Sequence, residues 1–191
     1  RLDGSGQPER VTPADSVGWH NYNISPNRRW AGQSASSFGQ PSKISLVDLS
    51  TKTVVRTIVD NAPLRAKLDA LQKGPHEFMG VDVGEGVSLD AWMMKPPGFD
   101  PAKKYPLVID VYGGPFTQAI RNRWSPARSE CEFGWLVAEI DNRGTINRGK
   151  TFETATYLGL GGVDLRDQVQ AVRELVERPY IDAGRVGIHG H

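Results

Sequence analysis

The chain has 191 residues, the length of one ordinary domain or slightly more. Its 23 basic and 22 acidic residues give a formal net charge of +1, so no excess of charge favours binding to nucleic acid or to an anionic membrane surface. No apolar run approaches the roughly 20 residues of a membrane-spanning helix. The single cysteine, Cys131, excludes an internal disulfide and a CxxC metal or redox site.

Residues 17–59 predict a series of short antiparallel strands. Apolar and β-branched stretches at 17–24, 30–38, 44–49 and 53–59 alternate with turn residues. A strand about every ten residues is typical of an antiparallel meander. Four strands make one propeller blade, but a single blade cannot bury its own faces, and a generic small β-sheet fits the pattern equally well.

A short helix and a hairpin are predicted next. Leucines recur at helical spacing over residues 64–71, after Pro63 and before Gly74-Pro75. Residues 77–83 and 87–94 flank a glycine-containing turn, which predicts a β-hairpin.

From Tyr105 onward the pattern changes to alternating strands and helices. Residues 107–111 and 135–140 are nearly continuous apolar runs, as expected for strands covered on both faces. Residues 186–188 predict a third strand, after a long helix. A strand, a helix and a strand of these lengths require a right-handed parallel crossover, so the predicted fold class is α/β.

The long helix is predicted over residues 164–178. Asp164 can cap its first turn, which also holds Asp167, and Pro179 ends it. The apolar stripe expected to face the sheet consists of Leu165, Val169, Val172 and Leu175.

A tyrosine and two glycines follow the first predicted parallel strand. In open α/β sheets ligands bind at the carboxyl ends of the strands, where Tyr112, Gly113 and Gly114 fall. Glycines allow a substrate to approach the backbone closely, and the Tyr112 hydroxyl could then donate a hydrogen bond. The alternative is a tyrosine packed at the strand end beside a turn that needs glycine, and spacing alone favours it.

The last six residues, Val186 to His191, carry a second signal. His189 and His191 alternate across a strand and cannot chelate one metal ion together, so no metal site is expected. A strand followed by Gly190 and His191 resembles the first half of a G-x-S-x-G nucleophile elbow. The serine would be the residue after His191.

Two further segments contain weaker signals. Residues 159–162 are glycine-rich but lack the spacing of a dinucleotide fingerprint, and the acidic start of the following helix disfavours phosphate. Arg143 follows the second parallel strand, where it could bind a substrate carboxylate. An ion pair with a nearby acid that fixes the loop is the favoured role.

Taken together, the motifs resemble the dipeptidyl peptidase IV branch of the prolyl oligopeptidase superfamily. The stretches that carry the resemblance, in the order of that family, are Gly18-Trp19-His20, Ser25-Pro26, residues 55–61, 64–71, 104–115, 141–144 and 185–191. This resemblance implies a partial α/β-hydrolase sheet preceded by the last antiparallel blade of a β-propeller. Residues 1–60 would end the propeller, 61–104 would form a linker helix and hairpin, and 105–191 would begin the hydrolase domain.

The resemblance also implies a function. Members of this branch are serine exopeptidases that release N-terminal dipeptides, typically Xaa-Pro or Xaa-Ala, without a cofactor. The tyrosine of the matching motif is Tyr112, which would donate to the oxyanion, while Gly113, Gly190 and His191 would flank the substrate pocket. The implied partner is a peptide with a free N-terminus, and a homodimer and a periplasmic or secreted location are compatible with the resemblance.

The matching stretches begin within the last blade and stop one residue before the expected serine. We therefore expect a piece of a longer protein that is inactive alone, because the triad aspartate and histidine would also lie beyond His191. Two alternatives remain at this point. One is a non-catalytic scaffold that binds protein partners, and the other is a different peptidase or an esterase of the same superfamily.

Overall fold

A computed structural model describes residues 5–7, 9–13, 15–71, 73–125 and 129–190. Contacts divide the chain into two units. The N-terminal unit comprises Arg1–Leu71 with Arg121–Ala127, and the C-terminal unit comprises Gln72–Ile120 with Arg128–His191. The division at residues 60 and 104 that the sequence suggests stays a prediction.

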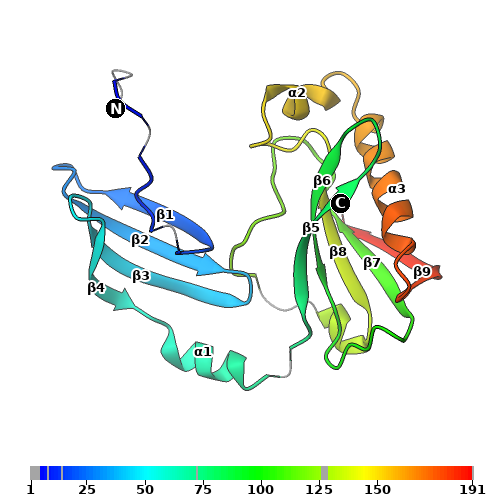
Figure 1. Cartoon of the computed structure of the whole chain (residues 1–191), viewed down its shortest axis with the longest axis horizontal. Coiled ribbons are helices and arrows are strands. Elements are labelled where there is room, and N and C mark those ends of the chain that lie inside the picture. Colours follow the sequence, from blue (N-terminus) through cyan, green and yellow to red (C-terminus); the bar gives the residue numbers. More distant parts are fainter. Residues whose placement is uncertain (1–4, 8, 14, 72, 126–128, 191) are drawn as a thin grey trace. The chain divides into compact units, whose positions relative to one another are not determined.

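The N-terminal unit contains one four-stranded antiparallel sheet. Its strands are β1 (Trp19–Ile24), β2 (Trp30–Ser37), β3 (Gln40–Asp48) and β4 (Thr53–Val59). Each strand pairs with the next along the chain, in the order β1-β2-β3-β4 (Figure 1). The predicted meander is thus confirmed.

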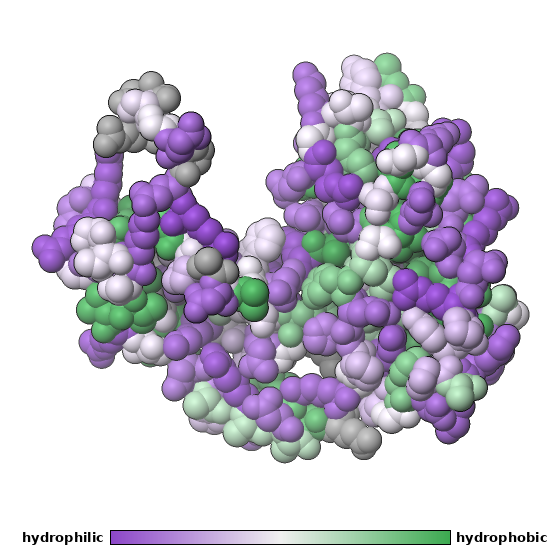
Figure 2. Space-filling model, viewed as in Figure 1, coloured by the Kyte–Doolittle hydropathy of each residue, from purple (hydrophilic) through white to green (hydrophobic). Residues whose placement is uncertain are grey.

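Few side chains of this sheet are buried. Ala31 and Val47 are, but every residue of β4 is exposed, including Val55 and Ile58 at 55% and 58%. Hydrophobic residues are visible in local patches at the surface of this unit, whose visible face is otherwise mostly hydrophilic (Figure 2). Among the described residues, no second layer covers β4.

Two further segments belong to the N-terminal unit. Helix α1 (Ala62–Asp69) begins with a proline in its first turn, as predicted, but has no buried residue. The segment from Arg121 is bound to the end of the β2–β3 hairpin. The Asn122 side chain accepts the Phe38 N–H at 2.8 Å, and the Trp124 N–H donates to Ser36 Oγ at 3.2 Å.

The C-terminal unit contains a mixed five-stranded sheet. Its strands are β5 (His76–Asp82), β6 (Ser88–Met94), β7 (Tyr105–Val111), β8 (Leu136–Asp141) and β9 (Ile181–Gly190). The order is β5-β6-β8-β7-β9, with β7 parallel to both of its neighbours. The predicted α/β class is confirmed, and the predicted hairpin joins this sheet through the pairing of β6 with β8.

Helix α3 (Val163–Val176) covers one face of the five-stranded sheet (Figure 1). The fully buried core between them is formed by Leu89, Met93, Leu107, Leu136, Ala138, Ala171 and Leu175. Alternate residues of β7 and β8 enter this core, as the period of two in a strand requires. Burial of this apolar surface is the main favourable contribution to the unit's stability.

The expected start of α3 is wrong by one residue, and so is its cap. The helix follows Gly162, and no side chain caps it. Asp164 lies inside the first turn, where its carboxylate accepts the Gly161 N–H at 3.0 Å. The Asp164 carboxylate thus folds back onto the preceding glycine loop instead of capping the helix.

The predicted buried stripe of α3 is also partly wrong. Leu165 and Val169 are exposed, whereas Asp167 and Gln168 face inward next to Ala171. A buried polar side chain is tolerated when its hydrogen bonds are made. Asp167 and Gln168 both bind the segment that follows β8, and this accounts for their burial.

Short helices connect the remaining elements: η1 (Ser129–Phe133), α2 (Lys150–Glu153) and η2 (Thr154–Thr156), none of which the sequence predicted. Cys131 in η1 is buried, and its thiol approaches the Met94 carbonyl oxygen at 3.7 Å. Within the described part of the chain, no helix has the length and hydrophobicity needed to cross a bilayer.

Candidate active site at the carboxyl end of the parallel strands

Tyr112 lies directly after β7, at the carboxyl end of the parallel strands. The last residue of β7, Val111, pairs with Gly190, the last residue of β9. The tyrosine therefore lies at the same sheet edge as the end of β9. Its side chain is 47% exposed, and no described residue forms a hydrogen bond with its hydroxyl. The hydroxyl is available to donate to a ligand.

Two of the predicted pocket residues are glycines whose geometry demands glycine. Gly113 has a φ of +71°, in the left-handed region that side chains disfavour. Gly190 has a φ of +135°, and a Cβ at this position would lie 1.9 Å from the Val111 carbonyl oxygen. The ends of β7 and β9 can approach this closely because position 190 has no side chain. His191, the fourth predicted site residue, lies outside the described residues.

Asn142 connects the loops that follow β7 and β8. Its buried side chain donates to the Gly113 carbonyl at 3.3 Å and to the Arg143 carbonyl at 2.7 Å. Its Oδ1 accepts a hydrogen bond from Gln168 Nε2 at 3.0 Å, and Gln168 also donates to the Ile140 carbonyl at 3.0 Å. Helix α3 therefore holds the loop that follows β7, residues 112–116 (the tyrosine loop), through Asn142.

Arg143 forms an ion pair with Asp167. Its Nη2 lies 2.6 Å from one carboxylate oxygen and its Nε 3.0 Å from the other, while its backbone N–H donates to the same carboxylate at 2.8 Å. Hydrogen bonding to this carboxylate, whose side chain is fully buried, raises the pKa of Arg143 above its ordinary value. Glu85 approaches the guanidinium at 3.3 Å from the β5–β6 turn. The structure shows the loop-fixing ion pair and gives no support to a substrate-binding role for Arg143.

Asp141 fixes the chain that leads away from the tyrosine loop. Its buried carboxylate accepts the N–H groups of Ala119 at 2.8 Å and Ile120 at 3.0 Å. Sequence reasoning identified residues 141–144 as a motif but did not assign these roles. The available signal was their composition, because several polar residues directly follow a buried strand.

An apolar pocket of about 380 Å³ lies next to the tyrosine loop. It is lined by Pro115, Phe116, Glu153, Thr154, Thr156, Tyr157, Leu158, Gly159 and Leu160. Phe116, Tyr157 and Leu158 are strongly exposed, at 69%, 78% and 92%. This pocket has no signal in the sequence, because its walls come from two loops about 40 residues apart. Contacts between loops leave no periodic pattern of apolar residues from which they could be predicted.

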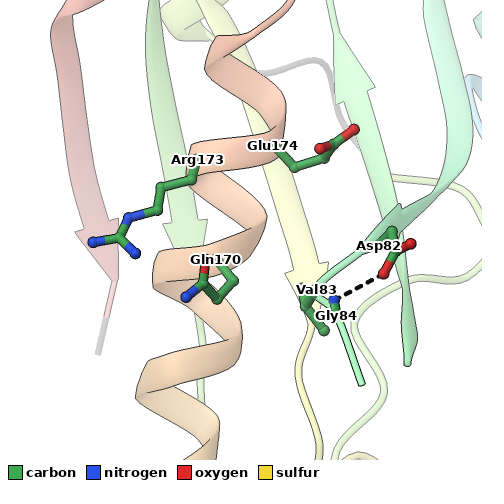
Figure 3. A pocket seen from close by; sticks show the side chains of 6 residues that line it. All are labelled: Asp82, Val83, Gly84, Gln170, Arg173 and Glu174. Carbon is green, nitrogen blue, oxygen red and sulfur yellow. Dashed lines mark hydrogen bonds between the residues drawn. The ribbon is translucent and has the colours of Figure 1, made fainter. Parts of the chain in front are cut away.

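A second pocket, of about 550 Å³, lies between α3 and the β5–β6 turn (Figure 3). Its walls are Asp82, Val83, Gly84, Gln170, Arg173 and Glu174. Arg173 and Glu174 point away from one another, and the Asp82 carboxylate accepts the Gly84 N–H. Its polar side chains do not converge on one point, so this pocket is a weaker candidate than the edge with Tyr112. Among the described residues, no cluster of three or more His, Cys, Asp or Glu could hold a metal ion.

The same part of the chain can be compared with known proteins. Residues 113–191 match the model of the prolyl oligopeptidase family. The crystal structure of Porphyromonas gingivalis dipeptidyl peptidase 4 superposes with a TM-score of 0.91 at 32% sequence identity, covering 98% of this chain and 27% of that protein. The chain is related to the dipeptidyl peptidases of the prolyl oligopeptidase family.

Curated relatives agree with this relationship. A probable dipeptidyl peptidase 4 from Aspergillus flavus is 33% identical over 147 residues, which are 74% of this chain and 19% of the relative. Human prolyl endopeptidase FAP is 35% identical over 150 residues, which are 76% of this chain and 20% of the relative. The chain thus spans about a fifth of these relatives. The expected propeller blade followed by an α/β-hydrolase sheet is confirmed by the match to the solved dipeptidyl peptidase.

Proposed function

We propose that this chain is part of a serine exopeptidase that releases N-terminal dipeptides, Xaa-Pro or Xaa-Ala, through an acyl-enzyme and without a cofactor. The observation that carries the proposal is the place of Tyr112. Its ring is half exposed at the carboxyl end of β7, beside the end of β9, in a chain related to dipeptidyl peptidases. In this role its hydroxyl donates to the oxyanion that forms when a serine attacks the peptide carbonyl.

The physical basis is preorganisation. Negative charge develops on the carbonyl oxygen only during the reaction, so a donor already aimed at that position lowers the barrier without reorganising. One such donor is worth about 3–4 kcal/mol in the transition state. The second donor would be the backbone N–H of the residue after the serine.

The other predicted site residues would shape the pocket. Gly190 allows the two strand ends to lie close together, and Gly113 adopts the left-handed backbone that follows Tyr112. His191 would stand before the nucleophilic serine without acting as the base. The triad aspartate and histidine would come from later residues. The 191-residue polypeptide purified alone should therefore give the buffer rate with a Gly-Pro-linked chromogenic substrate. Turnover that a serine-directed reagent abolishes would contradict this proposal.

Substrate choice is testable in the longer peptidase that we propose contains this chain. The dipeptidyl peptidase names of the Porphyromonas gingivalis and Aspergillus flavus proteins support the release of dipeptides. We propose that this release requires a free N-terminal amine. Gly-Pro-p-nitroanilide should be cleaved, whereas the same compound with an acetylated amine should not. Equal cleavage of the two compounds would exclude an exopeptidase that requires a free N-terminus.

A second candidate function is cleavage within peptides after proline. It is favoured by the human relative named prolyl endopeptidase FAP. An N-terminally blocked peptide with an internal Gly-Pro separates the two functions, because an exopeptidase leaves it intact. A protein that cleaves neither substrate and is not labelled by a serine-directed fluorophosphonate would instead be a non-catalytic scaffold.

A further inference from the structure

The ring of Tyr112 packs directly on Gly114, two residues later in the same loop. A Cβ placed on Gly114 would lie 2.9 Å from Cε1 of the tyrosine ring, 3.3 Å from Cζ and 3.4 Å from the hydroxyl oxygen. The first of these distances is shorter than carbon atoms tolerate in van der Waals contact. The ring occupies the space that any other residue at position 114 would need.

The backbone gives no other reason for glycine at this position. Gly113 has the left-handed φ of +71°, whereas Gly114 is not among the glycines with positive φ. Alanine at position 114 would therefore be compatible with the local backbone. What excludes a side chain there is the ring of Tyr112.

Hydrogen bonds hold the backbone of the loop on either side of Gly114 in the chain, so the ring must yield to an added Cβ. The Gly113 carbonyl accepts a hydrogen bond from Asn142, and the Phe116 N–H donates to the Gly144 carbonyl at 3.2 Å. Asn142 is itself buried and bound to α3 through Gln168. The tyrosine ring is half exposed and no described residue bonds its hydroxyl, so it can move more easily than the hydrogen-bonded backbone of the loop.

We propose that Gly114 is a positioning residue, which sets where the Tyr112 hydroxyl lies by leaving room for the ring against the loop backbone. This inference rests on the oxyanion role proposed for Tyr112 and adds a second residue to it. A methyl group at position 114 would displace the Tyr112 ring from the loop backbone. Its hydroxyl would then move away from the position of the oxyanion. Displacement of about 1 Å in such a donor costs up to ~100-fold in rate.

The test uses the longer peptidase with Gly114→Ala and Tyr112→Phe, singly and together. Gly114→Ala should lower kcat about 10- to 100-fold and change KM less than about threefold, because the affected interaction forms in the transition state. In the Tyr112→Phe background the same alanine should cost less than about threefold, because the hydroxyl that it displaces is gone. The matched control is Gly184→Ala, at an exposed position of β9 between the paired residues Ile181 and Val186, where the added Cβ makes ordinary contact. Its kcat should be unchanged.

The outcomes separate this inference from the proposed function. If Tyr112→Phe leaves kcat unchanged, the oxyanion role fails. If Tyr112→Phe lowers kcat but Gly114→Ala does not, the oxyanion role stands and the positioning role is overturned. An equal loss from Gly114→Ala with and without the hydroxyl also overturns it, because the alanine would then act on something other than the donor.

Protein folding offers an independent test if Gly114→Ala proves unstable. Should this variant unfold because its methyl group meets the ring, Tyr112→Ala together with Gly114→Ala removes the ring and should restore the thermal midpoint to that of Tyr112→Ala. A midpoint that stays low in the double variant would show that the ring is not what position 114 must accommodate, and it would overturn the inference.

Discussion

The loops that follow β7 and β8 lie at the same sheet edge, but their polar side chains differ in exposure and in hydrogen bonding. After β7, Tyr112 is half exposed, and no described residue bonds its hydroxyl. After β8, Asp141 and Asn142 are buried and bound to neighbouring chain segments. A polar group with free hydrogen-bonding capacity can act on a ligand, whereas a buried and saturated one can only hold structure.

The second loop holds the first in place. Asn142 binds the carbonyl of Gly113, and Asp141 binds the backbone N–H groups of Ala119 and Ile120. The exposed tyrosine thus depends on polar contacts made by its buried neighbours. Substitutions in the β8 loop should therefore act mainly on stability, and substitution of the tyrosine mainly on the rate. Variants of the proposed longer peptidase would test this separation.

The largest effect is expected for Asp167→Ala. This change leaves the Arg143 guanidinium without its buried partner, and breaking a buried ion pair costs about 3–5 kcal/mol. Chemical or thermal unfolding should show a loss of that order in the hydrolase domain. Residual folded enzyme should keep a nearly normal KM. A variant as stable as the parent would show that this ion pair does not hold the β8 loop.

Tyr112→Phe should give the next largest effect, but on catalysis. Removing the hydroxyl should lower kcat by ~100-fold or more with little change in KM, because the proposed oxyanion donor acts in the transition state. The thermal midpoint should not fall, since no described residue bonds that hydroxyl. Steady-state kinetics and thermal unfolding of the same sample check both parts, and an unaltered kcat would remove Tyr112 from the oxyanion role.

Asn142→Ala should have an intermediate effect on both quantities. The Gly113 carbonyl and the Gln168 amide would each lose a buried partner, which costs about 1–3 kcal/mol of stability. The kcat should fall less than in Tyr112→Phe, because the hydroxyl remains but its loop is looser. If kcat fell as far as in Tyr112→Phe without any loss of stability, Asn142 would belong to the reacting groups and not to the scaffold.

The smallest effect is expected for Arg185→Ala, which removes an exposed ion pair with Asp182. This exposed pair is the control for the buried pair of Arg143 and Asp167. Hydrogen bonding from Arg185 lowers the pKa of Asp182 in the folded protein. A carboxyl with a lowered folded pKa adds stability above its unfolded pKa and loses it as the pH falls through the folded value. The variant should raise the pKa of Asp182 toward its ordinary value in an NMR titration. Its thermal midpoint at pH 7 should stay within error, because exposed pairs are screened.

Much of the fold could be predicted from sequence because its signals are local. The strand over Thr53–Val59 has the bounds that its β-branched residues predict, and β7 follows from the apolar run that begins at Leu107. The full extent of β9 was missed. It begins at Ile181 rather than at Val186, because the residues between them have the composition of a turn and the pairing with β7 shifts register there.

The site was predictable only in part, for a physical reason. A strand end followed by a tyrosine and two glycines can be recognised locally, and the structure places Tyr112 at that strand end. The inward orientation of Asp167 depends on Arg143, which is 24 residues earlier in the chain. The period of apolar residues in a helix contains no information about such a partner, so Leu165 was expected to be buried in its place.

The close approach of β7 and β9 at Gly190 has a consequence for how this protein can vary. A Cβ there would meet the backbone of Val111 and not a side chain, so no rotamer change could make room for it. Saturation mutagenesis should consequently find position 190 intolerant even of alanine, although the residue is solvent-exposed in this chain. Exposure, which ordinarily signals freedom to mutate, is misleading where two main chains touch.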